Sequence, residues 1–157
     1  MKVRYLLFVG LVAAFAVSLA GGAVSAVAAE TPFKGEVNAV ETGTLVFPTL
    51  SLNRTGTGTA TYLGKYTQHV VMQIDVRFRT STGTATFTAA NGDTLFTSVV
   101  GQATPTSTPG VLTVVEVYTI TGGTGRFADA TGSFTLRSTV NQATGVSSGT
   151  FSGAVDH

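Results

Sequence analysis

Glu116 is the acidic residue whose surroundings could give it chemistry. Val115 precedes it, Val117 follows it, and Tyr118 stands two positions further along the chain. Because alternate residues of a strand share a face, Glu116 and Tyr118 are expected to point the same way. If that face is the inside of the fold, desolvation would raise the pKa of Glu116 and suit its carboxyl group for acid–base work. If it is the outside, Glu116 is a solvated charge; both faces are apolar, so the pattern leaves the choice open.

The sequence offers no pattern for metal-binding or thiol chemistry. It contains no cysteine, and its 2 histidines are His69 and His157. Neither histidine belongs to a group of Cys, Asp and Glu residues at metal-ligand spacing, so we expect neither a metal site nor a cofactor. We interpret His69 as a polar residue at the end of a strand.

A glycine-rich segment is the other notable motif, with Gly122, Gly123 and Gly125 followed by Arg126 and Phe127. Glycine-rich loops that bind phosphate groups lead into a helix, whereas this segment leads into another strand-like stretch, which excludes a nucleotide site. We interpret it as a structural reversal between two strands, because glycine permits sharp turns. Phe127 is then expected to turn inward and plug one end of the fold, while Arg126 binds carbonyl groups of the loop.

These residues lie on a chain whose alternation of apolar and polar side chains predicts β-strands throughout. The clearest strand is 70–79, in which one face is apolar and the other polar. Its apolar face is Met72, Ile74, Val76 and Phe78, and its polar face is Gln73, Asp75, Arg77 and Arg79, which we expect on the exterior. Further strands are expected at 33–41, 44–52, 62–68, 84–89, 93–101, 111–121, 132–141 and 146–155.

Turn residues separate these strands. Asn91-Gly92 predicts a tight hairpin of type I′, in which both central residues have positive φ. Asn53-Arg54-Thr55 fits the N-glycosylation pattern, and we interpret it as a polar turn. About eight strands joined mainly by short turns predict an all-β fold, and we expect an eight-stranded antiparallel up-and-down barrel. A barrel of this size is either packed with side chains or holds one small ligand.

Three segments resemble a known superfamily. Tyr118 to Gly132, with Gly-Gly-Thr-Gly-Arg-Phe at its centre, resembles a segment of dirigent and allene-oxide-cyclase-like proteins. Thr61 to Thr67 and Thr86 to Asp93 are similar to segments of small secreted bacterial members. The resemblance implies a calycin-like barrel, and it implies trimers by analogy with plant members. It also implies an enzyme as one alternative, because those enzymes act on apolar substrates through polar groups inside the barrel.

The first 28 residues have the pattern of a signal peptide. Lys2 and Arg4 precede an apolar run from Tyr5 to Leu19. Small residues then form a typical signal-peptidase cleavage site near Ala28/Ala29. We therefore expect one domain at 29–157 that is secreted or periplasmic, with no membrane contact after cleavage. Without Lys2 and Arg4, seven of the 9 Lys and Arg residues remain against 8 Asp and Glu residues, which gives a net charge near −1.

Charge and surface patterns limit the partners. The remaining basic residues are spread along the chain, which excludes a nucleic-acid patch. Two expected strands, 93–101 and 111–121, are apolar on both faces, so a homo-oligomer (trimer or dimer) that covers part of the outer wall is expected. Two functions remain open: a non-catalytic module that binds a small apolar ligand or has a structural role, or a cyclase or dirigent-type enzyme.

Overall fold

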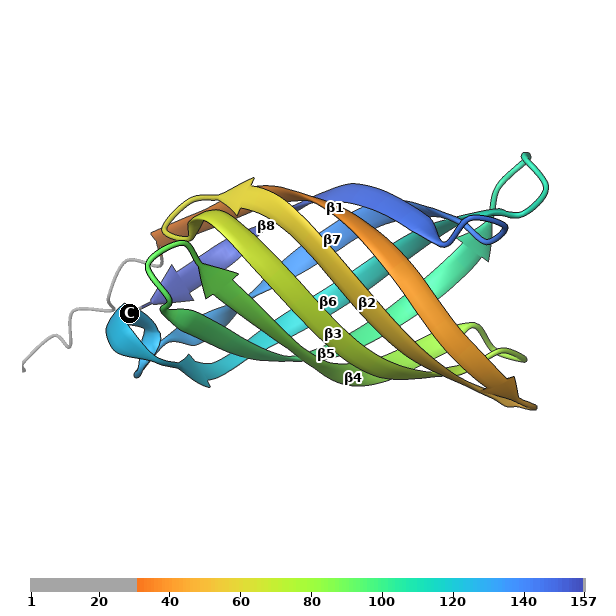
Figure 1. Ribbon diagram of the computed structural model, residues 1–157, viewed down its shortest axis with the longest axis horizontal. Coiled ribbons are helices and arrows are strands. Elements are labelled where there is room, and N and C mark those ends of the chain that lie inside the picture. Colours follow the sequence, from red (N-terminus) through yellow and green to blue (C-terminus); the bar gives the residue numbers. More distant parts are fainter. Residues whose placement is uncertain (1–30, 157) are drawn as a thin grey trace, which may run out of the picture.

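A computed structural model describes residues 31–156, which form a closed barrel of eight antiparallel strands (Figure 1). Each strand pairs with the next along the chain, and β8 pairs with β1 to close the sheet. Closure leaves no unpaired strand edge. The predicted eight-stranded antiparallel barrel is therefore confirmed, while the predicted signal peptide and His157 lie outside the described residues.

The strands are β1 (Thr31–Val46), β2 (Thr49–Ala60), β3 (Gly64–Asp75), β4 (Thr80–Ala89), β5 (Thr94–Pro105), β6 (Val111–Gly123), β7 (Thr131–Asn141) and β8 (Val146–Asp156). A single 3-10 turn, η1 (Gly125–Phe127), connects β6 to β7. The turns after β1, β3, β5 and β7 lie at one end of the barrel, which we call the open end. Both ends of the described chain and η1 lie at the other, which we call the closed end (Figure 1).

Several strand boundaries in the first half differ from the prediction. Residues 44–52 are not one strand, because the chain reverses at Phe47-Pro48 between β1 and β2. Proline has no backbone N–H group for the ladder and is suited to a turn. The predicted strand 62–68 begins only at Gly64, and it continues without a break into the start of 70–79, so that both belong to one strand, β3.

The predicted strand 70–79 ends at Asp75 because a local turn competes with the ladder. The backbone N–H of Arg77 donates to the Asp75 carboxylate at 2.9 Å, which is the geometry of an Asx turn. Arg79 has a φ of 55°, which a strand does not allow. Phe78 is consequently 66% exposed on this turn and does not face the core as predicted.

The hairpin predicted at Asn91-Gly92 joins β4 to β5, but its type I′ assignment is wrong. Gly92 has a φ of 90°, whereas Asn91 does not have the positive φ that type I′ requires. The Asn91 side chain instead accepts a hydrogen bond from the backbone N–H of Asp93 at 3.1 Å. The turn is thus stabilised by a hydrogen bond from the backbone to the Asn91 side chain, and not by the positive φ at Asn91 that was predicted.

Aromatic rings fill the half of the lumen next to the closed end. Phe134 is the centre of this aromatic cluster: its ring centroid lies 5.1 Å from that of Phe33 and 4.9 Å from that of Phe151. It stacks on Tyr118 at 4.7 Å and meets Phe87 edge-on at 5.7 Å. Such contacts add to the stabilisation that burial of the rings provides. This half of the barrel is a packed core.

Replacing Phe134 with alanine tests this packing. Phe134 is 2% exposed and contacts several rings, so Phe134→Ala is expected to lower the free energy of unfolding by about 3–5 kcal/mol. Phe96→Ala is the matched control, because Phe96 is 40% exposed on the outer wall, and its cost is expected to be about 1 kcal/mol or less. Urea denaturation followed by circular dichroism measures both. Equal losses for the two variants would contradict a core centred on Phe134.

Candidate functional site

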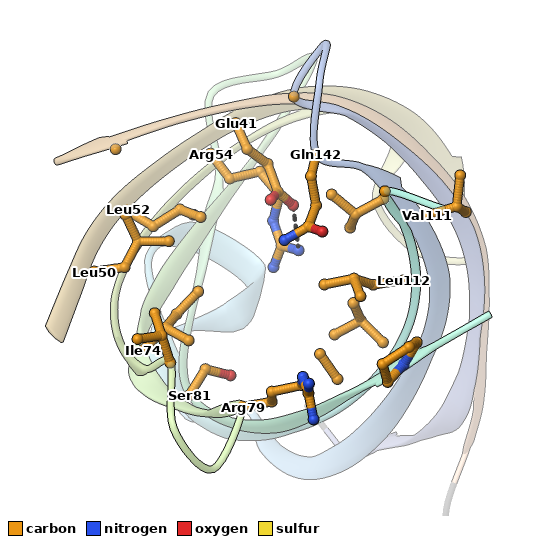
Figure 2. A pocket seen from close by; sticks show the side chains of 18 of the residues that line it. Glu41, Leu50, Leu52, Arg54, Ile74, Arg79, Ser81, Val111, Leu112 and Gln142 are labelled. Carbon is orange, nitrogen blue, oxygen red and sulfur yellow. Dashed lines mark hydrogen bonds and ion pairs between the residues drawn. The ribbon is translucent and has the colours of Figure 1, made fainter. Parts of the chain in front are cut away.

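The half of the lumen next to the open end contains a cavity of about 500 Å³ (Figure 2). Strands β1 to β7 and the turns of the open end contribute to its wall. Its apolar lining consists mainly of Leu50, Leu52, Met72, Ile74, Leu112, Val114 and Val140. The labelled side chains Leu52 and Leu112 face each other across the open space in Figure 2. The lumen is therefore filled at one end and hollow at the other.

Glu116 lies inside the barrel, where its side chain lines this cavity and the residue is 1% exposed. Arg54 Nη2 donates to Glu116 Oε2 at 2.7 Å, and the Tyr118 hydroxyl donates to the same oxygen at 2.8 Å. Arg54 Nη2 also lies 2.7 Å from the Tyr118 hydroxyl oxygen, which accepts from it. Of the two alternatives for Glu116, the structure shows the inward one. Glu116, Tyr118 and Arg54 form a closed hydrogen-bonded triangle.

Arg54 supplies the positive charge of the site, and the sequence interpretation of Asn53-Arg54-Thr55 as a polar turn is wrong. The residue lies within β2, is 2% exposed, and shares the inward face with Leu50 and Leu52. Burial opposes its charge, but Tyr118 and Glu116 more than offset this effect, so the pKa of Arg54 is raised. Its Nε has no hydrogen-bond partner within the described chain.

Glu41 of β1 is a second carboxyl group beside Arg54, so that Arg54, Glu41, Glu116 and Tyr118 together form one polar layer across the lumen. Its Oε1 lies 3.4 Å from Arg54 Nη1, a longer contact than Arg54 makes with Glu116 (Figure 2). Burial raises the pKa of Glu41, the charge of Glu116 raises it further, and Arg54 and the Ser147 hydroxyl oppose the rise. A carboxyl group with a raised pKa holds its proton to higher pH than an exposed glutamate does. The sequence analysis did not single out Glu41. Its spacing of two and four residues from Ala39 and Val37, which are buried, places it on the same inward face of β1.

Tyr118 acts as a hydrogen-bond donor in this network. Burial raises its pKa well above the ordinary value, and the neighbouring Glu116 carboxylate also raises it, while Arg54 opposes the rise. The phenol is therefore neutral at physiological pH and keeps the proton that it donates to Glu116. Its ring at the same time stacks on Phe134, so Tyr118 joins the polar layer to the aromatic cluster.

Ser147, which lies beside Glu41, was also missed. It belongs to the sequence Gly145-Val146-Ser147-Ser148-Gly149, which has the Gly-x-Ser-x-Gly spacing of a hydrolase nucleophile. That motif requires a strand-to-helix turn, whereas Ser147 is a buried residue within β8. His69, the histidine within the described residues, is exposed on β3 and faces away from the lumen. The arrangement does not form a serine triad.

The glycine-rich loop lies at the closed end, away from the cavity. Gly122 and Gly125 have φ values of 125° and 57°, which allow the reversal between β6 and β7. Phe127 is fully buried beneath this reversal. Arg126 does not bind the loop carbonyls as predicted: its Nε lies 3.6 Å from an Asp93 carboxylate oxygen, and its guanidinium covers the Phe127 ring at 4.9 Å.

Charged residues predicted on the exterior divide into two groups. Asp75 and Arg77 do form an exposed pair, with a 2.6 Å contact, and Arg77 holds the pKa of Asp75 down at about 2. Arg79 is also exposed, and its side chain lines the mouth of the cavity (Figure 2). His69 lies in the middle of β3 rather than at a strand end.

Comparisons with known proteins identify no relative. No protein-family model matches the chain, and no curated protein or solved structure matches it. The resemblance to dirigent and allene-oxide-cyclase-like proteins therefore stays a prediction from the segments that carry it. Between residues 31 and 156 the structure has no helix long and apolar enough to cross a membrane. The same residues contain no group of three or more His, Cys, Asp or Glu side chains arranged to hold a metal ion.

The raised pKa of Glu41 predicts a pH-dependent stability. Its folded-state pKa exceeds the ordinary value of 4.5, so the folded protein binds this proton more tightly than the unfolded chain does. The resulting stability is complete below about pH 4.5 and is lost as the pH rises through the folded-state pKa. Glu41→Gln removes this loss, so the variant is expected to gain stability relative to the wild type between pH 4 and pH 8, by about 1.4 kcal/mol per unit of pKa difference.

Urea denaturation at a series of pH values measures this difference. Glu36→Gln, on the exposed face of the same strand, controls for the loss of one negative charge from β1. A difference between Glu41→Gln and the wild type that stays constant from pH 4 to pH 8 would show that Glu41 does not titrate as described.

Proposed function

We propose that this chain binds a small, largely apolar molecule in the lumen of its barrel. The observation that supports this function is the cavity of about 500 Å³, with an apolar wall and a charged floor of Arg54, Glu116 and Glu41. Small-molecule sites are typically a few hundred to a thousand cubic ångströms in volume, mostly apolar, and contain a few polar groups that orient the ligand. This cavity has each of those properties.

The floor favours a ligand with a neutral polar end. Arg54 is already paired with Glu116 at 2.7 Å, so the floor has no unpaired positive charge that would attract an anion. The contact between Arg54 Nη1 and Glu41 is longer, at 3.4 Å, and leaves both groups able to reach a ligand atom. A hydroxyl group can donate to Glu41 and accept from Arg54, while the rest of the molecule contacts Leu112 and the other apolar wall residues.

Catalysis on the bound molecule is the second candidate, as an allene-oxide-cyclase-type or dirigent-type reaction. It is favoured by the convergence of Glu41, Arg54, Glu116 and Tyr118 on one layer beside the cavity. Within that layer Glu116 and Tyr118 are engaged in the closed triangle with Arg54. Glu41, with its raised pKa, is the group best suited to transfer a proton. The non-catalytic function has priority because a barrel lumen with polar groups does not by itself imply a reaction.

The binding proposal predicts that protein purified from its natural source retains a small molecule detectable by native mass spectrometry. Leu112→Trp is expected to lower the retained fraction about tenfold or more, because the larger side chain occupies the cavity. Val71→Trp is the matched control, since Val71 is 44% exposed on the outer wall, and should retain the molecule like the wild type. Circular dichroism checks that both variants fold.

The results separate the two candidates. Equal retention by Leu112→Trp and the wild type, or no retained molecule in any sample, would argue against ligand binding in the lumen. A molecule that is recovered unchanged after prolonged incubation supports a binding module. A molecule that the wild type converts, and that Glu41→Gln binds without converting, supports the enzyme.

We also propose that residues 1–28 direct export and that the barrel acts outside the cytoplasm. The support is the order of features in the sequence: two basic residues, an apolar run and a small-residue cleavage site near Ala28. The absence of cysteine is compatible with an oxidising compartment, because no thiol is available for unwanted pairing.

Part of the outer wall supports a further proposal, a homo-oligomer. Val100 of β5 and Val117 of β6 are paired across strands and are 54% and 42% exposed. Phe96 extends the same apolar face of β5, with 40% of its surface exposed. Apolar side chains gathered on one wall are typical of a surface that another subunit covers.

The oligomer proposal predicts a mass of two or three chains by light scattering at micromolar concentration. Val100→Lys combined with Val117→Lys is expected to give a monomer, because two buried like charges oppose association. Val71→Lys, on the outer wall of β3, should leave the mass unchanged. A monomeric wild-type protein would overturn the proposal.

A further inference from the structure

The open end of the barrel carries a group of exposed apolar side chains that no part of the described fold covers. Val46 and Phe47 are 74% and 73% exposed, Phe78 is 66% exposed, and Leu45 is 56% exposed. Among the large apolar residues of the described chain, these four are the most exposed. Tight turns usually carry Gly, Asn, Asp or Ser, so apolar residues at these tips need a separate explanation.

The two turns that carry these residues are neighbours. The backbone N–H of Val76 donates to the carbonyl of Pro48 at 3.0 Å, which joins the β3–β4 turn to the β1–β2 tip. Figure 1 shows both tips projecting from the same end of the barrel, on the side where β1 ends. Phe47 and Phe78 therefore belong to one apolar rim, which we define as Leu45, Val46, Phe47 and Phe78.

The charge beside this rim is positive. The turns of the open end, residues 47–48, 76–79, 106–110 and 142–145, contain Arg77 and Arg79 and no carboxylate. The neighbouring carboxylate, Asp75 at the end of β3, is held by Arg77 at 2.6 Å. The turns of the closed end, in contrast, contain two carboxylates, Asp93 and Asp129, and one basic residue, Arg126. The two ends of the barrel thus differ in charge as well as in apolar exposure.

We propose that the open end docks on an anionic lipid surface. Val46, Phe47 and Phe78 insert among the lipid headgroups, and Arg79, which forms no ion pair within residues 31–156, interacts with lipid phosphate groups. A protein partner would need a shaped surface to accept separate projecting turns, whereas a fluid lipid layer closes around them. Arg79 also lines the cavity mouth, so docking directs that mouth toward the lipid. The proposal does not depend on ligand binding, because the rim lies outside the cavity.

A single tryptophan at the rim tests this proposal directly. The natural chain has no tryptophan, so Phe47→Trp in the full chain reports on one position. With vesicles of phosphatidylcholine and phosphatidylglycerol, its emission is expected to shift to shorter wavelength and to be quenched by brominated lipid. Val71→Trp, on the outer wall of β3, should show neither change. Attachment through the apolar N-terminal run alone would leave both tryptophans unaffected, and that result would overturn the proposal.

Removal of the apolar and basic groups gives the second readout. Phe47→Ser combined with Phe78→Ser is expected to weaken partitioning onto anionic vesicles about tenfold or more, since two aromatic side chains no longer enter the lipid. Val71→Ser should change it less than about twofold, because Val71 lies away from the rim. Arg79→Gln should weaken the preference for anionic over pure phosphatidylcholine vesicles, because Arg77 is already paired with Asp75.

Two further outcomes would overturn lipid docking. Equal partitioning of the Phe47→Ser/Phe78→Ser variant and the wild type would show that the rim does not contact lipid. An emission shift of the Phe47→Trp variant that follows protein concentration without vesicles would assign the rim to a second copy of the chain.

Discussion

The buried guanidinium of Arg54 is the constraint on which the interior of this barrel depends. A positive charge removed from water is destabilising unless carboxylates and hydrogen-bond acceptors surround it. Here Glu116 approaches to 2.7 Å from one side of the lumen, Glu41 to 3.4 Å from another, and the Tyr118 hydroxyl completes the arrangement. These partners come from β1 and β6, while Arg54 itself lies on β2, so pairing of this one charge joins opposite walls of the barrel.

The Arg54 layer also divides the lumen into two halves with different physical properties. Toward the closed end, Phe134 and its neighbouring rings occupy the space, and Phe127 closes the end beneath the glycine-rich loop. Toward the open end the inward side chains are mainly aliphatic, and a cavity of about 500 Å³ remains. The closed half supplies the stability of a packed core, which leaves the open half free to remain hollow. This division is what makes a binding function physically reasonable.

The sequence predicted the fold better than it predicted the site. Strict alternation, as in Thr84 to Ala89, indicates a strand with one buried face, and repeated short turns indicate the meander that closes into a barrel. The same alternation failed at β6, where apolar residues occupy both faces and Glu116 could belong to either. It also failed at Asn53-Arg54-Thr55, because three polar residues in succession resemble a turn when the pairing partners of the strand are unknown. Glu41 was also missed, although its alternation with Val37 and Ala39 places it on the inward face of β1.

By itself, then, the sequence determined the local structure of the chain. It indicated about eight strands, mostly short connections, and a reversal at Gly122–Phe127. These features arise from local backbone preferences and from the two-residue repeat of a strand. Only the tertiary structure decided which charges share the lumen. Arg54 and Glu116 are 62 positions apart in sequence, and their 2.7 Å contact exists because barrel closure places β2 and β6 across the same interior. Whether that interior is filled or hollow depends on how side chains from all eight strands pack together, and no single segment contains this information.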